Sequence, residues 1–354
     1  MKNSPPRVLV TGAQGYIGTV LMPLLRAAGC EAVGLDTGYF AGCTLAPTAD
    51  GQVHRRDVRA LAPADLAGFQ AVIHLAALSN DPLGNLDPEL TYDINHRASV
   101  RLAELARAAG VARFLVSSSC SVYGAAGDEF VTEAAELEPI TAYGRSKVLA
   151  DRDIAALADE RFCPVFLRNA TAYGFSPRLR LDLVLNDFVA NAVTTGKILI
   201  RSDGSPWRPV VHVEDICRAF LALLNAPRES VFNQAFNVGR TDENYRVRDL
   251  AQIVAEVAPG CEIEYAPGGQ PDLRCYRVNC DKLSAAVPEF RAVWDVRRGA
   301  EQLRDNYRQY GLTAADLEGP RYVRLRALRQ QLDSGALDAR LRWTKAAALQ
   351  ESTR

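Results

Sequence analysis

A strand, a glycine-rich turn and the start of a helix follow one another near the N-terminus, and they constrain the fold more than any other stretch. The apolar run Val8-Leu9-Val10 predicts a buried parallel strand. Three glycines follow at the spacing Gly12-x-x-Gly15-x-x-Gly18, and residues 19–28 carry apolar side chains at helical spacing. Such a turn suits a pyrophosphate. Its first glycine permits the tight turn, the second lets the backbone approach the phosphates, and the third lets the helix pack on the strand.

A carboxylate at the end of the second predicted strand supports a dinucleotide site. Residues 31–35 form this strand, and Asp36 follows it at about the 20-residue offset expected of a ribose-binding carboxylate. Without that strand, the glycine triplet would indicate only an ordinary strand–helix turn. Residues 37–40 contain no Arg or Lys to neutralise a 2′-phosphate. The sequence therefore predicts NAD as the cofactor rather than NADP.

Strands and helices alternate along the first half of the chain. Further strands are predicted at 70–77, 113–119 and 163–168, and helices at 88–109 and 141–157. This order predicts an α/β fold, a Rossmann-type doubly wound parallel sheet. After about residue 175, shorter elements among prolines, glycines and arginines predict a smaller α/β substrate-binding lobe over the carboxyl ends of the strands. We expect a dinucleotide-binding domain at 1–175 to which the chain returns around 209–240, a substrate lobe within 176–318, and a helical extension at 319–354.

Composition excludes several classes of function. The net charge of −1 argues against binding to nucleic acid or to an anionic membrane surface. No apolar run is long enough to span a bilayer, and residues 1–6 do not form a signal peptide. The eight cysteines form no C-x-x-C pair, which favours reduced thiols and a cytoplasmic location. The four histidines lie far apart, so no metal site is expected.

A phenol and an ammonium group are predicted to share one face of the helix at 141–157. Tyr143 and Lys147 are four residues apart. A nearby lysine cation favours the phenolate and should lower the pKa of Tyr143. Tyr143 could then exchange a proton with a substrate hydroxyl while a hydride moves to or from a nicotinamide. Ser119, at the end of the preceding strand, would hydrogen-bond to the same substrate oxygen.

Two further segments could contact the cofactor. Asp57 and Val58 follow a third predicted strand and either meet an adenine ring or form an ordinary strand-end turn. The small side chains of Ala76 and Ala77 would let a cofactor lie close to the strand at 70–77.

At these motifs the chain resembles the extended short-chain dehydrogenase/reductases of the nucleotide-sugar epimerase/dehydratase type. The resemblance is carried by residues 11–18, Asp36, 57–58, 74–77, Asn95, 117–124, Tyr143, Lys147 and 208–215. It implies NAD-dependent hydride transfer at C4 of a nucleotide-diphosphate sugar, and a homodimer that pairs through the helices at 88–109 and 141–157. The catalytic residues implied are Ser119, Tyr143 and Lys147. The cofactor residues implied are Gly12, Gln14, Gly15, Tyr16, Ile17, Gly18, Asp36, Asp57, Val58, Leu75, Ala76, Ala77, Asn95, Tyr143 and Lys147.

The candidate substrate residues lie mostly in the second half of the chain. They are Ser119, Ser121, Thr171, Arg178, Arg180, Asn186, Arg208 and Arg274. Four of them have an alternative interpretation where the residues alone are considered. Arg178 and Arg180 could be solvated loop charges, Asn186 could cap a helix turn, and Trp207 could stack on Arg208.

Details of these segments separate possible reactions. Thr171 stands where many epimerases carry an asparagine, and residues 176–187 and 271–276 resemble a subgroup that includes a GDP-heptose 4-dehydrogenase. A net 4-dehydrogenase or 4-keto reductase is therefore the alternative to an epimerase. A dinucleotide sensor without catalysis is a remoter alternative, which the proton-transfer residues disfavour. Cys120 and Ser121 replace the Asp–Glu pair of the related 4,6-dehydratases, so no dehydration is expected.

Overall fold

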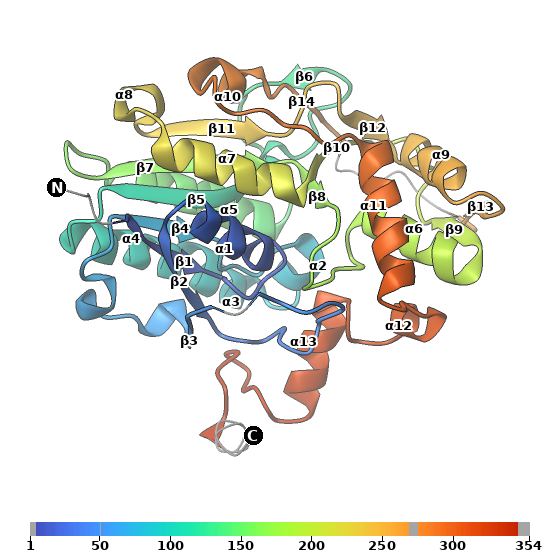
Figure 1. Ribbon diagram of the computed structural model, residues 1–354, viewed down its shortest axis with the longest axis horizontal. Coiled ribbons are helices and arrows are strands. Elements are labelled where there is room, and N and C mark those ends of the chain that lie inside the picture. The colour runs from blue at the N-terminus through green and yellow to red at the C-terminus, as the bar shows by residue number, and fades with distance from the viewer. Residues whose placement is uncertain (1–4, 50, 269–274, 346–354) are drawn as a thin grey trace.

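A seven-stranded parallel sheet lies at the centre of the structure, a computed structural model that describes residues 5–49, 51–268 and 275–345. The strand order is β11-β7-β5-β4-β1-β2-β3, and every neighbouring pair is parallel (Figure 1). The predicted doubly wound parallel sheet is confirmed. Its strands are β1 (Arg7–Thr11), β2 (Glu31–Asp36), β3 (Val53–Arg55), β4 (Ala71–His74), β5 (Arg113–Ser119), β7 (Cys163–Asn169) and β11 (Gln234–Val238).

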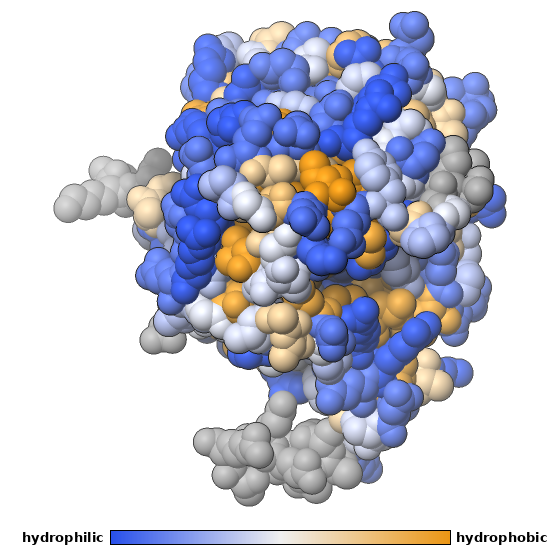
Figure 2. All heavy atoms as spheres, turned by 90° about the vertical axis from the view of Figure 1, so that its right-hand side faces the viewer, coloured by the Kyte–Doolittle hydropathy of each residue, from blue (hydrophilic) through white to orange (hydrophobic). Residues whose placement is uncertain are grey.

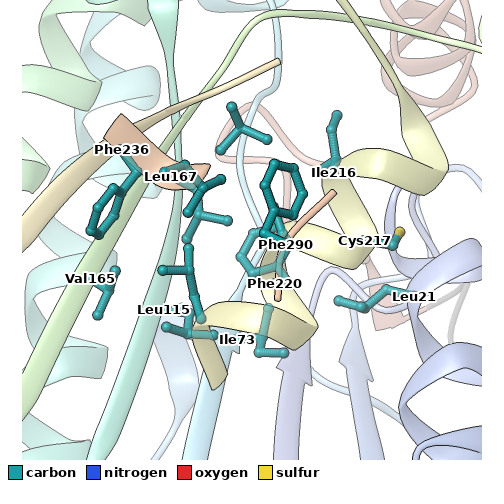
Figure 3. Close-up of a cluster of buried hydrophobic side chains, with 14 of the residues drawn as sticks. Leu21, Ile73, Leu115, Val165, Leu167, Ile216, Cys217, Phe220, Phe236 and Phe290 are labelled. Carbon is teal, nitrogen blue, oxygen red and sulfur yellow. The ribbon is translucent and has the colours of Figure 1, made fainter. Parts of the chain in front are cut away.

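Helices cover both faces of this sheet. Side chains alternate along each strand, so apolar residues reach both faces and both need a cover. Ile73 and Leu115 point to one face, where Phe220 of α7 (Val213–Asn225) packs on them with α1 (Gly18–Ala27) (Figure 3). Val72 and Phe114, one residue earlier in each strand, point to the opposite face under α4 (Ala98–Ala108) and α5 (Ala142–Ala155). Burial on both faces explains why the strands read as continuous apolar runs.

The helix predicted at 88–109 contains one irregular turn. It comprises α3 (Pro88–Tyr92), a π turn, η3 (Asp93–Arg97), and α4. The π turn holds Asn95, whose Oδ1 accepts a hydrogen bond from Leu78 N at 2.8 Å and whose Nδ2 donates to Leu78 O at 3.0 Å. The amide thereby fixes the loop after β4.

A smaller lobe lies beside the sheet, at the right in Figure 1. Its helices α6 (Val184–Thr195), α9 (Val247–Val257) and α11 (Val296–Gln309) share a second apolar cluster. The lobe also holds a sheet of β8 (Thr171–Tyr173), β10 (Trp207–His212) and β12 (Asn244–Arg246), and a pair of β9 (Lys197–Ile200) and β13 (Glu262–Tyr265). Polar residues dominate the outer side of the lobe, where hydrophobic residues gather in a few groups (Figure 2).

Short elements complete the described chain. They are the β6 (Phe130–Val131) and β14 (Arg277–Val278) pair, α2 (Asp81–Gly84), α8 (Arg228–Val231), α10 (Asp281–Ala286), α12 (Ala314–Glu318), η1 (Val58–Ala60), η2 (Pro63–Leu66) and η4 (Cys120–Tyr123). Over the described ranges, no helix combines the length and the apolar character needed to cross a membrane.

The C-terminal segment, residues 319–345, is only partly helical. Its helix is α13 (Arg324–Asp333), and a bridge between Leu337 and Trp343 closes the turn that follows. Leu328 and Leu341 are buried against Tyr39 and Leu78. The segment therefore packs on the loop that follows β2, below the sheet in Figure 1.

Candidate active site

The glycine turn after β1 has the close packing that its spacing predicts. Gly12 has a φ of 74°, and a Cβ added there would lie 2.8 Å from Ala76 N. A Cβ on Gly18 would lie 2.3 Å from Gly12 O. Side chains at either position would therefore push the helix start away from the strands.

A hollow runs from this turn along the ends of β1, β2 and β4. Asp36 lies in its wall, where its Oδ2 accepts a hydrogen bond from Gln14 N at 2.9 Å and its Oδ1 accepts one from Gly38 N at 2.8 Å. Burial raises the pKa of Asp36, and the two amide hydrogen bonds oppose this rise. The predicted cofactor residues that line this cofactor hollow are Gly12, Gly15, Tyr16, Ile17, Gly18, Asp36, Asp57, Val58, Leu75, Ala76 and Ala77.

Two predicted cofactor residues support the wall of the cofactor hollow but do not line it. Gln14 holds Asp36 through its backbone N–H, and its carbonyl accepts a hydrogen bond from Arg178 Nε at 2.8 Å. Asn95 is buried and bonds to Leu78 through its side-chain amide. Both residues support the hollow without lining it.

The first turns of α5 bring Tyr143 and Lys147 together. Thr141 Oγ1 caps the helix by accepting a hydrogen bond from Gly144 N at 3.0 Å. Lys147 Nζ donates to Ser117 O at 2.7 Å and lies 5.9 Å from the centre of the Tyr143 ring. Ser119 Oγ, at the end of β5, accepts a hydrogen bond from Ser121 N at 3.2 Å. The strand end and the helix face thus meet as the sequence predicts.

Burial controls the protonation of both groups. It raises the pKa of Tyr143 to about 12, although a hydrogen bond with Ser119 opposes the rise. It lowers the pKa of Lys147 to about 8, and the Asp151 carboxylate opposes that fall. The pKa of Tyr143 is thus raised in this structure rather than lowered as expected, because desolvation of the phenol outweighs the lowering by Ser119 and Arg180.

Asp151 is a buried carboxylate that the sequence analysis missed. It follows Lys147 by one helical turn, and its Oδ2 accepts a hydrogen bond from Ser118 Oγ at 2.7 Å. Burial raises the pKa of Asp151 to about 6. The signal in the sequence was the spacing of Tyr143, Lys147 and Asp151, which places all three on one helix face.

A second hollow adjoins the cofactor hollow, and Tyr143 and Lys147 line it. The two hollows share Ile17, Leu75, Ala77, Ser79 and Arg180 in their walls. Among the candidate substrate residues, Ser119, Ser121, Thr171, Arg180 and Arg208 line this catalytic hollow.

Polar groups without partners are available in the catalytic hollow. Ser121 Oγ and Asn169 Oδ1 are buried and have no hydrogen-bond partner within residues 5–49, 51–268 and 275–345. Asn169 was not predicted, and its place at the end of β7, beside Ser119 at the end of β5, was the available signal. Arg180 is held by Asp182, with Nε donating to Oδ1 at 2.9 Å and Nη2 donating to Oδ2 at 3.1 Å.

The remaining candidate substrate residues lie elsewhere. Arg178 is buried, and its Nε donates to Gln14 O at 2.8 Å while its Nη1 donates to Phe40 O at 3.0 Å. Asn186 is fully buried. Its Oδ1 accepts a hydrogen bond from Gly174 N, and its Nδ2 donates one to Arg180 O. The structure thus places both behind the walls, because loop carbonyls and amides occupy their polar atoms. Arg274 lies outside the described residues.

Cys120 has no contact with the catalytic hollow. Its thiol is buried, donates to Arg168 O at 3.1 Å, and has a pKa that burial raises. Among the residues that the structure describes, no group of three or more His, Cys, Asp or Glu residues is placed to hold a metal ion.

Comparison with known proteins identifies the family. The model of the NAD dependent epimerase/dehydratase family matches residues 8–239. The chain belongs to this family. The resemblance inferred from the sequence is confirmed, and the match includes Ser119, Tyr143, Lys147 and Arg208. It excludes the C-terminal segment, residues 319–345.

Curated relatives and solved structures agree with this family. A UDP-glucose 4-epimerase of Mycolicibacterium smegmatis is 31% identical over 289 residues, which are 77% of this chain and 90% of that protein. The low-salt glycan biosynthesis protein Agl12 of Haloferax volcanii is 27% identical over 312 residues, covering 85% of this chain and 98% of that protein. MoeE5, solved in complex with UDP-glucuronic acid and NAD, is 28% identical with a TM-score of 0.75, covering 86% of this chain and 99% of that chain.

Proposed function

We propose that the protein is an NAD-dependent nucleotide-sugar 4-epimerase. The observation that carries this proposal is the position of Tyr143, Lys147 and Ser119 in the catalytic hollow, where it adjoins the hollow lined by the glycine turn and Asp36. Relatives that are UDP-glucose 4-epimerases support the reaction class. MoeE5 with NAD and UDP-glucose supports the ligand classes.

The residues of the cofactor hollow fit NAD. The glycine turn would hold the pyrophosphate, and Asp36 would accept hydrogen bonds from the adenosine ribose. The small Ala76 and Ala77 leave room beside β4. When bound, NAD supplies a hydride acceptor for the sugar carbon and a hydride donor for the return step.

The side chains of the catalytic hollow would move and hold one proton. In its phenolate form, Tyr143 accepts the proton of the C4 hydroxyl while the C4 hydride leaves as a pair of electrons with its hydrogen. Lys147 stabilises the phenolate, and Ser119 orients the same hydroxyl. Arg180 and Arg208 line the hollow and would bind the diphosphate of the substrate. Returning the hydride to the other face of the ketone, while Tyr143 gives its proton back to the C4 oxygen, would invert C4.

A net 4-dehydrogenase or 4-keto reductase is the second candidate. Thr171 favours it, because this residue lines the catalytic hollow where many epimerases carry an asparagine. This candidate differs in one step, since the reduced cofactor leaves before the ketone is reduced again. The assembled proton-transfer residues disfavour the remoter idea of a non-catalytic sensor.

The proposal includes a homodimer in the cytoplasm. The cysteine pattern supports the location. For the dimer, Val100, Leu105, Val148 and Leu149 are half-buried and remain candidates for the contact face. Two apolar residues of the same helices do not reach that face, because Leu102 and Ile154 are fully buried within the chain.

A panel of nucleotide sugars tests the function. Each UDP- and GDP-hexose, hexuronic acid and heptose is incubated with the protein, with and without added NAD, and the products are followed by mass spectrometry and NMR. An epimerase gives a C4 epimer of unchanged mass with no accumulation of NADH. A product two mass units lighter, formed with stoichiometric NADH, would favour the dehydrogenase instead. The Tyr143→Phe variant is the inactive control for every substrate.

A further inference from the structure

The C-terminal segment contributes a buried guanidinium to the cofactor hollow. Arg324, the first residue of α13, is 2% exposed and lines the hollow together with Asp36 and the glycine turn. Its Nη2 donates to Arg178 O at 3.3 Å, and its guanidinium carbon lies 4.3 Å from the centre of the Phe40 ring. Its Nη1 is buried and finds no hydrogen-bond partner within the described part of the chain. Leaving such a donor unpaired is costly unless a ligand supplies the acceptor.

Several contacts fix this segment against the cofactor hollow. Arg342 forms an ion pair with Asp57 at 2.9 Å, and Trp343 Nε1 donates to Thr37 O at 2.7 Å. The hydroxyl of Tyr39 donates to Leu341 O. Asp57, Thr37 and Tyr39 all line the hollow themselves. The segment thus holds Arg324 in place through the residues that form the wall.

The charges around Arg324 favour an anion. Burial lowers the pKa of Arg324 to about 10, so the side chain is still a cation at neutral pH. Two carboxylates act on it, but Asp36 already accepts two backbone hydrogen bonds and Asp182 is paired with Arg180. An unpaired guanidinium N–H in a desolvated wall is a strong donor to phosphate oxygen.

We propose that Arg324 is a cofactor-binding residue that donates a hydrogen bond to the pyrophosphate of NAD. The proposal rests on the proposed cofactor, and it adds to the glycine turn a cation from outside the matched residues 8–239. A guanidinium from the C-terminal segment strengthens the hold on the diphosphate. It leaves recognition of the adenosine to Asp36 and the residues around Val58.

Binding to the cofactor-free protein tests the proposal. Dissociation constants are measured by calorimetry for NAD, ADP-ribose and adenosine, with the wild-type protein and with Arg324→Met, which keeps the buried bulk and removes the charge. We expect Arg324→Met to weaken NAD and ADP-ribose by about 10- to 100-fold, as for a lost hydrogen bond to a charged group, and adenosine by less than about threefold. Arg329→Met is the matched control, because Arg329 is an exposed arginine of the same helix, and it should change none of the three.

The outcomes separate this proposal from the proposed function. Unchanged NAD affinity in Arg324→Met would overturn the role of Arg324, while NAD binding to the wild-type protein would still support the cofactor. An equal loss for adenosine would also overturn it, since the effect would then come from the shape of the wall. Failure of the wild-type protein to bind NAD would count against the proposed function itself. If thermal unfolding shows that the methionine variant is not folded, Arg324→Lys replaces it. That variant keeps the charge but not the planar donor pair, and it should weaken NAD and ADP-ribose but not adenosine.

Discussion

Lys147 Nζ lies 5.9 Å from the centre of the Tyr143 ring while it donates a hydrogen bond to Ser117 O at 2.7 Å. The carbonyl belongs to β5 and the two side chains to α5, so the strand and the helix together set the distance between ammonium and phenol. Any shift of α5 against β5 would change the position of both groups relative to Ser119.

Removal of the Tyr143 hydroxyl should nearly abolish turnover. Tyr143→Phe keeps the ring in its packed position but leaves no group to accept the substrate proton, so we expect kcat to fall by about 100- to 10,000-fold with nucleotide-sugar binding largely unchanged. Steady-state rates and calorimetry measure the two effects. Tyr310→Phe, on an exposed tyrosine, is the control. A Tyr143→Phe rate within about threefold of wild type would mean that another base acts.

Asp151→Asn should move the alkaline limb of the pH profile of kcat/KM to lower pH. Burial lowers the pKa of Lys147 to about 8, and the Asp151 carboxylate keeps it from falling further. Without this carboxylate, Lys147 gives up its proton at a lower pH. Asp153→Asn, at a half-buried position of the same helix whose carboxylate contacts His96 rather than Lys147, should leave the limb in place. An unchanged limb in Asp151→Asn would show that Lys147 does not control it.

The same substitution has a signature in stability. The pKa of Asp151 is raised from 3.8 to about 6, so between these pH values the native state keeps a proton that the unfolded chain has lost. The free energy of unfolding of the wild-type protein therefore decreases as pH rises through this window, and Asp151→Asn should lack that decrease. Urea unfolding at pH 4, 5 and 6 measures the difference. If the free energy of unfolding depended on pH in the same way in both proteins, the pKa of Asp151 would not be raised in the native state.

The protein should bind NAD more tightly than NADP, by at least about tenfold. Asp36 is fixed by two backbone amides, and its carboxylate would repel a 2′-phosphate. Titration of the cofactor-free protein with both dinucleotides measures the ratio. Asp36→Asn, which removes the charge at constant size, should reduce the preference. Equal or tighter binding of NADP by the wild-type protein would overturn the assignment.

The enzyme should not dehydrate its substrate. Elimination across C5 and C6 requires two further proton-transfer groups. Cys120, however, is buried away from the catalytic hollow with a raised pKa, and Ser121 is an alcohol. Asp81 is the single carboxylate in the described wall of that hollow. In deuterated water we expect an inverted C4 or a 4-keto sugar, with no solvent deuterium at C5 or C6. Loss of one water from the product mass would contradict this expectation.

The protein should be a dimer whose contact face includes the outer sides of α4 and α5. Light scattering at micromolar concentration should give twice the chain mass of 38.6 kDa. Leu105→Asp, which places a charge on a half-buried position of α4, should shift the mass toward the monomer. Leu199→Asp, at an exposed position of β9, should not. A monomeric wild-type protein would contradict the prediction.

Local sequence signals predicted the sheet and the residues at its strand ends. The strand at 113–119 was predicted with its observed bounds, because an apolar run followed by serines marks a buried strand that reaches a site. The same reasoning could not place Arg178 or Asn186, whose partners come from distant loops. Arg324 had no local signal, since its environment is created by residues far from it in the chain. The π turn was also missed, because helical spacing tolerates one extra residue.

Because of that π turn, the number of residues between Pro88 and Ala108 affects the cofactor hollow. A π turn contains one residue more than a regular turn, so deleting one residue within 93–97 would allow an unbroken α-helix to form. The repaired helix would be locally more regular, and its two halves would keep their relative rotation, because the π turn only absorbs the extra residue. The change would therefore fall on residues 93–97 themselves. Asn95 would then no longer reach both polar atoms of Leu78, and the wall of the cofactor hollow behind Ala77 would lose its support. Substitutions in this helix should therefore be tolerated far better than insertions or deletions.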